Sequence, residues 1–310
     1  MGALLIREVR SEADIEAFLV IRAAVDPANP MTREAWDAER DTAGRLDLLG
    51  CVGQDAVGCA FAERMYGDPS SSIGWISIRA EHRRQGFGTA LLRRVAEHVS
   101  GFGGSLLFAG TTSTALDMLA FLAHHGFEEV GRMQDVELVL AGADTVVALP
   151  EGIVIMPLSA DLDAGAHAVA LEADADVPVA TPIGTGDLTR WRERNLNALA
   201  ERELSFAALA GDEVVGFAIA GRCVPGVVEH YMTGVKRAWR GRGVARALKG
   251  AQITAAREAG HERLRTQNDL ANAPMRAINE RLGYRPRLEW VQFKGPLVSA
   301  KQHGKPKRSG

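Results

Sequence analysis

The sequence predicts two consecutive copies of one mixed α/β (α+β) domain, each with a mixed central sheet flanked by helices. The chain has 310 residues, about twice the usual single-domain length of roughly 150 residues. Two segments repeat an apolar strand-like run, a basic glycine turn and a helical stretch at a constant offset of 157 positions. Each half then continues with a strand, a helix and closing strands. This order is typical of a helix-flanked sheet.

The repeat rests on residues at equal spacing. Three pairs lie 157 positions apart: Arg83 and Arg240, Gly86 and Gly243, Gly126 and Gly283. An aromatic residue follows each member of the last pair. Because a fixed period marks a duplicated structural unit, we expect an N-terminal domain at 1–142 and a C-terminal domain at 151–298. We also expect a flexible basic tail at 299–310.

Local patterns predict the elements of each copy in order. Residues 3–8 and 153–157 contain short apolar runs and predict the opening strands. Ser11 with Asp14 forms a capping-box pattern, which predicts a helix start. Strand-like runs at 204–210 and 214–220, separated by the turn Gly211-Asp212, predict a hairpin. Helical stretches follow both glycine turns, and further strands are expected near Leu106 and Leu264.

Composition limits the class of protein. Hydrophobic residues make up 46% and charged residues 24% of the chain, which is typical of a globular protein. No apolar run is long enough to span a bilayer and the start lacks a signal-peptide pattern, so we expect a cytoplasmic protein with no membrane partner. A formal net charge of -3 makes nucleic acid an unlikely partner. Cys51, Cys59 and Cys223 have no metal-ligand spacing, so no metal is expected.

The glycine turns have the chemistry of a phosphate site. A helix start carries unpaired N–H groups and partial positive charge. Glycines let an anion approach the backbone, and the neighbouring arginines add charge. The alternative is that glycine only permits a tight strand-to-helix connection. A dinucleotide fingerprint would need a third glycine, but Leu91 and Arg246 stand there, and the chain contains no Gly-Lys-Ser/Thr triplet of a P-loop.

The pattern at 83–88 and 240–245 resembles the acetyl-CoA pyrophosphate loop of the GNAT N-acetyltransferase superfamily. The second copy, at 233–243 and 266–275, is similar to a branch of tandem bacterial enzymes of the mycothiol synthase type. The resemblance implies acetyl-CoA as donor substrate, no metal, and a small-molecule amine as acceptor. It places cofactor-binding residues at Val235, Arg240, Gly241, Arg242, Gly243, Val244, Ala245 and Asn272, and at Ile78, Arg83, Arg84, Gln85, Gly86, Phe87 and Gly88.

The resemblance also bears on catalysis. Many members have a tyrosine four residues before the glycine–aromatic pair, where it serves the leaving thiolate. That position is Asn279 in the second copy and Leu122 in the first. Asn279 cannot act as an acid but can donate a hydrogen bond, so we assign activity to the second copy. Glu229 is the expected base, unless it is only an exposed strand-end charge, and Tyr284 is expected in the core.

Two functions stay open at this stage. The first is an N-acetyltransferase whose acidic loop, Glu172 to Asp176, recognises a cationic amine or is merely solvated. The second is a non-catalytic acyl-CoA-binding or sensing protein, because both copies lack the tyrosine. Either a monomer or a homodimer is compatible with two fused copies.

Overall fold

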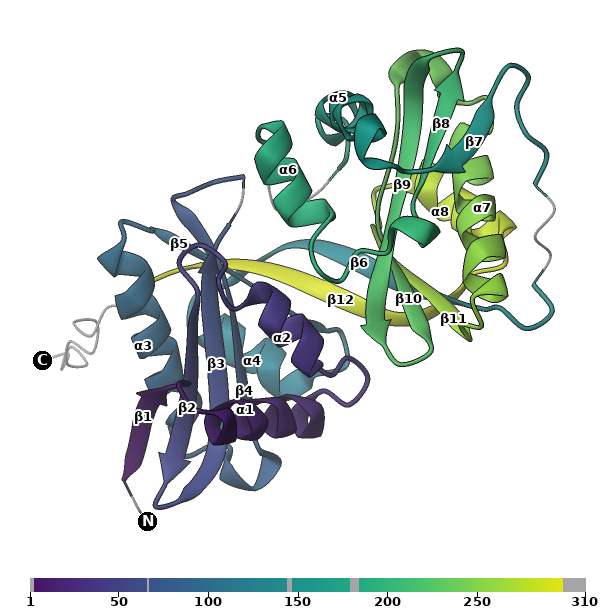
Figure 1. Ribbon diagram of the computed structural model, residues 1–310. Helices are drawn as coiled ribbons and strands as arrows, with labels where there is room; N and C mark the ends of the chain where they lie inside the picture. The colour runs from purple at the N-terminus through teal and green to yellow at the C-terminus, as the bar shows by residue number, and fades with distance from the viewer. Residues whose placement is uncertain (1–2, 66, 144–146, 179–183, 298–310) are drawn as a thin grey trace, which may run out of the picture. The chain divides into compact units, whose positions relative to one another are not determined.

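A computed structural model describes residues 3–65, 67–143, 147–178 and 184–297 (Figure 1). Contacts divide the chain into two compact units, residues 1–130 with 292–310, and residues 131–291. The predicted basic tail at 299–310 lies outside the described residues, as does part of the segment between the two copies.

The first unit contains a mixed sheet. Its strands follow the order β1 (Leu4–Glu8), β2 (Leu46–Val52), β3 (Asp55–Arg64), β4 (Ser71–Ile78) and β5 (Leu106–Thr112). The pairs β1–β2, β2–β3 and β3–β4 are antiparallel, whereas the pair β4–β5 is parallel. The helices of this unit are α1 (Glu12–Val25), α2 (Arg33–Glu39), α3 (Phe87–Gly101) and α4 (Leu116–His124).

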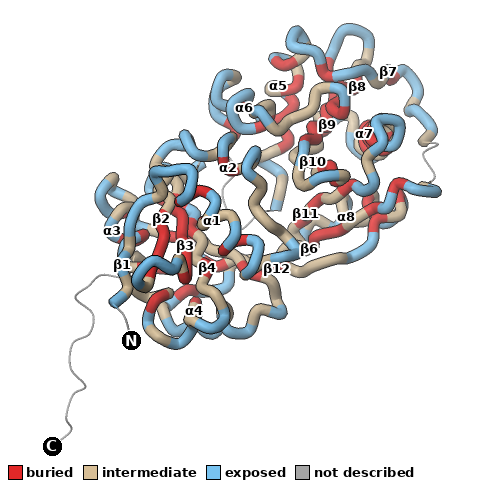
Figure 2. Tube along the Cα trace, turned by 60° about the horizontal axis from the view of Figure 1, so that its bottom comes forward, coloured by how far each residue is buried: buried red, intermediate tan, exposed pale blue. Residues whose placement is uncertain are grey.

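Helices α1 and α3 cover opposite faces of this sheet. Phe18 and Ile21 of α1 pack in one cluster with Cys59 and Phe61 of β3. Leu91 of α3 instead lies over the alternate position, Gly58. Because successive strand residues point to opposite faces, the two helices enclose the sheet, and the buried strands β2 and β3 lie between them (Figure 2).

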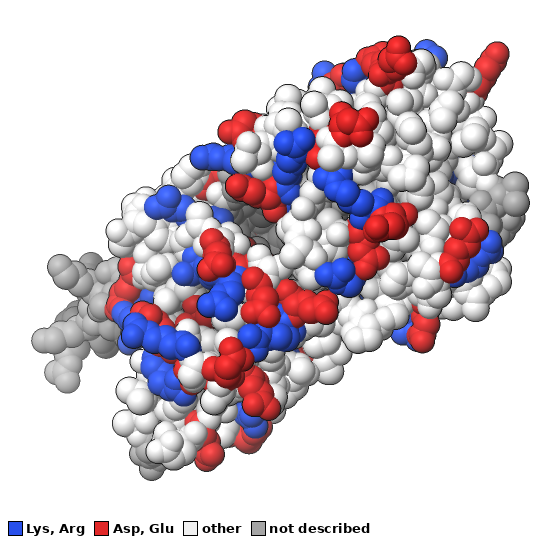
Figure 3. Space-filling model, viewed as in Figure 1, with Lys and Arg blue, Asp and Glu red and all other residues white. Residues whose placement is uncertain are grey.

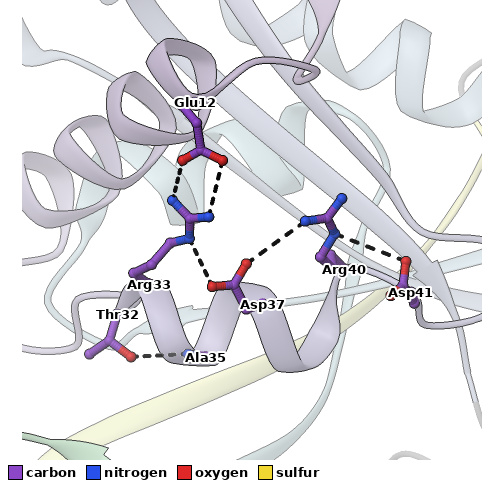
Figure 4. A network of polar contacts seen from close by, with 7 residues as sticks. All are labelled: Glu12, Thr32, Arg33, Ala35, Asp37, Arg40 and Asp41. Carbon is purple, nitrogen blue, oxygen red and sulfur yellow. Dashed lines mark hydrogen bonds and ion pairs between the residues drawn. The ribbon is translucent and has the colours of Figure 1, made fainter.

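The helix start predicted at Ser11 forms as expected, and a second cap at Thr32 is a finding of the structure. Ser11 and Asp14 make the reciprocal capping box at the start of α1. Thr32 caps α2 by accepting from the backbone N–H of Ala35 at 3.1 Å. Arg33 then joins the two helices through Glu12 and is held by Asp37 at 2.8 Å (Figure 4). This exposed ion-pair network orients α2 more than it stabilises the fold.

The second unit repeats this plan. Its strands follow the order β7 (Val154–Pro157), β8 (Phe206–Ala210), β9 (Glu213–Val224), β10 (Val227–Val235) and β11 (Arg263–Asp269), and β6 (Glu128–Val139) comes next to β11. Strands β10 and β11 are parallel, like β4 and β5. The helices are α5 (Asp163–Asp174), α6 (Leu188–Asn195), α7 (Val244–Glu258) and α8 (Ala273–Arg281), and β12 (Arg285–Pro296) closes the chain.

Helices again cover both faces of the sheet. Val169 of α5 and Trp191 of α6 pack with Phe217 on one face. On the other face, Leu248 of α7 packs with Val215 and Val235. Strands β9 and β10 are therefore buried between two helical layers (Figures 1 and 2).

The final strand of the first copy belongs to the second unit. From Met133 to Val139, β6 pairs antiparallel with β11, between Asp269 and Arg263. The end of β12, from Gln292, belongs to the first unit, where β12 follows β5 in the strand order. The contact-based units therefore differ from the boundaries predicted at 142 and 151. A strand pattern indicates that a strand exists but not which strand it pairs with.

Positive and negative side chains are intermixed on the surface that Figure 3 shows. Lys and Arg alternate there with Asp and Glu instead of gathering by sign, in keeping with the net charge of -3. Among the described helices, none has the length and hydrophobicity that crossing a bilayer requires.

Candidate active site

In both copies the two parallel strands diverge. Strands β10 and β11 pair only up to Glu229 and Arg265, although β10 continues to Val235. In the first copy, β4 and β5 pair only up to Ile73 and Phe108. Beyond these points the facing backbone groups of the two strands do not bond each other. A ligand with amide groups can pair with backbone groups at such a divergence.

A bulge distinguishes the second copy. The register of β10 against β9 shifts between His230 and Met232, whereas β4 pairs with β3 without a shift. As a result Tyr231 and Met232, neighbours in sequence, both pack toward the cluster of α5 and α6. Bulges leave a residue outside the ladder and are common next to active sites. This bulge lies beside Glu229, where β10 and β11 part.

The glycine turns have the same geometry in both copies. The Nε of Arg83 donates to the carbonyl of Ile78 at 3.1 Å, and the Nε of Arg240 donates to the carbonyl of Val235 at 3.0 Å. These predicted cofactor-binding arginines therefore tie the turn to the end of the strand. The helices α3 and α7 begin after Gly86 and Gly243, at φ angles of 82° and 90°.

One turn position is strained in the first copy only. Gly241 has a φ of 72°, and its counterpart Arg84 has a φ of 61°. The left-handed region costs a side chain such as arginine free energy, and such residues cluster at functional sites. The first copy therefore keeps the left-handed backbone of this turn even though it has arginine, not glycine, at the position of Gly241.

The turns leave room for an anion. A Cβ at Gly86 or Gly241 would meet no atom within 4 Å, and one at Gly243 would meet only Pro150, at 3.9 Å. No side chain caps α3 or α7. Four other helices begin with a side-chain cap, from Ser11, Thr32, Asp187 and Asn272. The first N–H groups of α3 and α7 thus have no side-chain acceptor from the N-cap and suit a phosphate.

The other predicted cofactor residues of the second copy have mixed positions. Val235 and Val244 are buried in the cluster that anchors α7 to the sheet, with Ala245 packed against it. The guanidinium of Arg242 lies 5.0 Å from the ring centroid of Trp239. The side chain of Asn272 accepts from the N–H of Met275 at 3.3 Å and so caps α8.

Their counterparts in the first copy are equally varied. Phe87 is buried at the start of α3. The amide of Gln85 donates to the carbonyl of Glu81 at 3.4 Å. Gly88 lies against the ring of Phe121, which a Cβ would approach to 3.2 Å. In both copies the backbone of the turn, more than its side chains, has the form of an anion site.

The acidic loop predicted to recognise a cation bonds to the protein itself. Asp176 accepts from Arg237 at 2.6 Å and from Arg240 at 2.7 Å, and these bonds lower its pKa. Glu172 accepts from the backbone N–H of Arg237. The hydroxyl of Thr185 donates to Asp174 at 2.6 Å. All three carboxylates already have donors, so this geometry does not favour the cation-recognition hypothesis.

Glu229 lies half-buried among charged groups on the sheet face away from α7. Burial, and then the nearby carboxylate of Asp135, raise its pKa above the ordinary value. Arg265 and Arg287 lower the pKa less, since each has a carboxylate partner, Glu137 at 2.7 Å and Asp135 at 2.5 Å. A carboxylate with a raised pKa is a better proton acceptor. Glu229 is therefore not simply an exposed strand-end charge.

Asn279 is buried in α8 with 2% of its surface exposed. Neither its amide nitrogen nor its amide oxygen has a hydrogen-bond partner in the described structure. An unsatisfied buried amide costs free energy, and such a group calls for an explanation. Asn279 is available to a ligand, as its prediction requires.

A buried polar cluster on the α7 side was not predicted from the sequence. It consists of His230, Lys249, Gln252 and Tyr284, and all four are almost fully buried. The Oε1 of Gln252 can only accept, so Nδ1 of His230 donates to it, at 2.7 Å. In the neutral imidazole, Nε2 then accepts from the hydroxyl of Tyr284. The Nζ of Lys249 lies 5.7 Å from the ring centroid of Tyr284.

A comparison of the two copies, position by position, could have indicated this cluster from the sequence. The equivalent positions of the first copy carry no polar side chain: Leu92, Val95 and Phe127 at the 157-residue offset, and Gly74, which the strand pairing before the bulge aligns with His230. Lys249 and Gln252 also fall on the buried stripe of α7, where polar residues are uncommon. Tyr284 is in the core as predicted, and there its hydroxyl forms a hydrogen bond with His230. Among the described residues no group of His, Cys, Asp and Glu has the arrangement of a metal site.

Comparisons with known proteins agree with this geometry. A model of the acetyltransferase (GNAT) family matches residues 11–127 and 170–284. No curated protein sequence matches the chain. Among solved structures, a GCN5-related N-acetyltransferase from Sphaerobacter thermophilus is 19% identical with a TM-score of 0.77, over 96% of each chain. A tandem GNAT protein from the clavulanic acid biosynthesis pathway is 17% identical with the same TM-score, over 96% of this chain and 99% of the other. At these identities the likeness establishes the fold, and the predicted tandem architecture is confirmed.

Proposed function

Because the chain belongs to the acetyltransferase (GNAT) family, we propose that its second copy transfers an acetyl group from acetyl-CoA to the primary amine of a small molecule. Acyl transfer follows from the family. The acetyl donor, the amine acceptor and the assignment to one copy are the proposal. The observation that carries it is the position of the Glu229 carboxylate where β10 and β11 part, in the copy whose glycine turn leaves room for a pyrophosphate.

The turn and the parted strands support binding of acetyl-CoA. The pyrophosphate would accept from the first N–H groups of α7, with Gly241 and Gly243 providing the space. The pantetheine arm carries amide groups that can pair with the backbone of β10 beyond Glu229. Its thioester end would then lie near the bulge, between Glu229 on one face of the sheet and His230 on the other.

The chemistry requires one proton acceptor and one proton donor. The amine nitrogen attacks the thioester carbonyl carbon, and the carbon–sulfur bond breaks. Glu229 takes the proton that the amine loses, and the leaving thiolate takes a proton to become CoA. Asn279 can donate a hydrogen bond to the sulfur or to the arm, but it has no acidic proton to give.

For the first copy we propose acyl-CoA binding without transfer. It keeps the parted strands, the open Gly86 and the strained Arg84. Ile73, Gly74 and Leu122 stand where the second copy has Glu229, His230 and Asn279. A cytoplasmic location and a monomeric or homodimeric state remain predictions.

Release of CoA from acetyl-CoA in the presence of amines tests the proposal. The panel should include amino acids, aminoglycosides, polyamines and cysteinyl sugars. Gly243→Glu places bulk and negative charge at the pyrophosphate of the second copy, and we expect it to lower kcat/KM by at least about 100-fold. Gly86→Glu is the matched control, because both glycines have a left-handed φ and open space.

The outcomes separate the hypotheses. Loss of turnover in Gly243→Glu alone supports catalysis by the second copy. Equal loss in both variants would contradict the assignment to one copy. Tight binding of acetyl-CoA by calorimetry without CoA release for any amine would favour a binding or sensing protein.

A further inference from the structure

The buried polar cluster lies beside the point where β10 and β11 part, near which the proposed reaction would release the thiolate of CoA. His230 directly follows Glu229, the last residue of β10 that pairs with β11. Its imidazole is fixed by Gln252 and Tyr284, and the amide of Gln252 is itself fixed by donating to the carbonyl of Leu204 at 3.0 Å. The cluster therefore forms an ordered wall on the α7 side of the point where the strands part.

Lys249 is the exceptional member of the cluster. Its side chain leaves α7 inside the core and is 1% exposed. Among the described residues no carboxylate forms an ion pair with it, and burial alone lowers its pKa to about 7. The ring face of Tyr284 is within cation–π distance of the ammonium. A buried amine with so little compensation destabilises the fold, and such costs are typical of functional positions.

Asn279 belongs to the same neighbourhood. Its backbone carbonyl accepts from the N–H of Tyr284 at 3.0 Å. Its side-chain amide has no partner in the described structure. Tyr284 therefore contacts Lys249 through its ring and Asn279 through the backbone. The first copy has leucine at both equivalent positions, Leu92 and Leu122.

We propose that Lys249 is the proton donor to the leaving thiolate of CoA, and that Tyr284 and His230 are positioning residues that hold it. This inference rests on the proposed acetyl transfer by the second copy. Lys249 would then be the general acid of the reaction, a role that Asn279 cannot fill because its amide has no acidic proton. The inference also identifies the groups that the first copy has lost.

The step balances as follows. As the carbon–sulfur bond breaks, the bond's electron pair goes to sulfur. The Lys249 ammonium gives one proton to that sulfur, leaving a neutral amine and free CoA. Glu229 meanwhile holds the proton taken from the acceptor amine. Proton exchange with solvent then restores the Glu229 carboxylate and the Lys249 ammonium, so no oxidant, reductant or further reactant is needed.

The surroundings of Lys249 are compatible with this role. A lysine whose pKa is about 7 gives up a proton far more readily than an ordinary lysine. The titratable groups that face it are His230 from β10 and Tyr284 before β12. Burial, and next the charge of Lys249, lower the pKa of His230, and burial raises that of Tyr284, so both stay neutral near pH 7. Neither competes with Lys249 as the donor.

The decisive experiment measures the thiol of bound CoA, not turnover. Ultraviolet absorbance of the thiolate is recorded against pH for CoA bound to the wild type and to Lys249→Met, which replaces the amine with an apolar side chain of similar size. A nearby ammonium stabilises a thiolate, so the variant should raise the bound thiol's pKa by about 1 to 3. Both proteins carry Gly86→Glu, so that CoA binds only to the second copy, and Leu92→Met in this background should leave the pKa unchanged.

Turnover provides the second readout. Lys249→Met should lower kcat by at least about 100-fold, the size of general acid catalysis, with the KM for acetyl-CoA nearly unchanged. In the wild type, kcat should fall at high pH as Lys249 loses its proton, and this fall should be absent from the pH profile of Lys249→Met. Tyr284→Phe should shift the pH of this fall and lower kcat less, because it disturbs the position of Lys249 without removing its proton.

The failures are distinguishable. If the wild type does not bind CoA, or binds it and never releases CoA from acetyl-CoA, the proposed function fails. If it turns over while Lys249→Met shows the same thiol pKa and the same kcat, the inference about Lys249 fails and the proposed function stands. If Lys249→Met does not fold, Lys249→Gln is measured in the same way.

Discussion

His230 and Tyr284, 54 positions apart in the sequence, are joined by a hydrogen bond in the core of the second unit. The bond ties the strand at the point of divergence to the residue that follows the last helix. The first copy has Gly74 and Phe127 at these positions, which cannot form it. The two copies therefore share a backbone plan but differ in the chemistry of the core beside the site.

Removing the hydroxyl of Tyr284 should destabilise the second unit. In Tyr284→Phe the Nε2 of His230 remains buried with no donor, and an unsatisfied buried group costs about 1–3 kcal/mol. Denaturant unfolding followed by circular dichroism measures the change. His230→Ile removes the same bond from the other side, so in a double-mutant cycle with Tyr284→Phe the two losses should be less than additive. Fully additive losses would contradict this account.

The buried amine should make stability depend on pH in a defined window. The pKa of Lys249 falls from 10.5 in the unfolded chain to about 7 in the folded protein. Between these values the unfolded state binds more protons, so the free energy of unfolding rises as pH rises from about 7 toward 10.5. Lys249→Met should be more stable than the wild type at pH 7, and its lead should shrink toward pH 10. Parallel profiles for the two proteins would show that Lys249 does not titrate in this range.

Glu229 should control the acidic limb of the rate profile. A base works in its deprotonated form, and burial raises the pKa of Glu229 above 4.5. The kcat profile should therefore rise with pH through a midpoint above 4.5. Glu229→Gln should lower kcat by at least about 100-fold and remove the limb. Glu258→Gln, an exposed change at the end of α7, is the control. An unchanged limb in Glu229→Gln would assign the base elsewhere.

Asp176 should weaken the binding of CoA. Its carboxylate holds Arg237 and Arg240 beside the glycine turn, and its charge opposes a phosphate there. Asp176→Asn should tighten CoA binding several-fold in calorimetry at low salt and lose this gain at high salt, where screening is strong. Asp161→Asn removes an exposed charge far along the chain from this loop and should leave the affinity unchanged. Weaker binding by Asp176→Asn would mean that Asp176 positions the arginines for the ligand.

Periodicity and turn chemistry predicted most of the elements. The capping box at Ser11, the hairpin around Gly211 and the helix that follows the second glycine turn form where they were expected. Local signals suffice for these features because neighbouring residues determine caps, turns and amphipathic helices. The duplicated glycine turns could also be predicted, since both residue type and spacing are needed to make them.

The unpredicted features depend on residues far apart in the sequence. The bond between His230 and Tyr284 and the buried Lys249 become visible only when β10, α7 and the segment after α8 come together. The ion pairs of Asp176 with Arg237 and Arg240 cross 61 and 64 positions. No local pattern distinguishes those pairs from solvated charges.

The exchange of final strands explains why a copy without catalytic chemistry would persist. The first copy supplies β6 to the sheet of the second unit, directly beside β11 of the candidate site. A cut after residue 142 would leave each product with one strand missing and one strand without its partner. An intact sheet beside β11 therefore requires the first copy's final strand, whatever the chemistry of the first copy's own core. A chain cut at this point should lose stability in both halves.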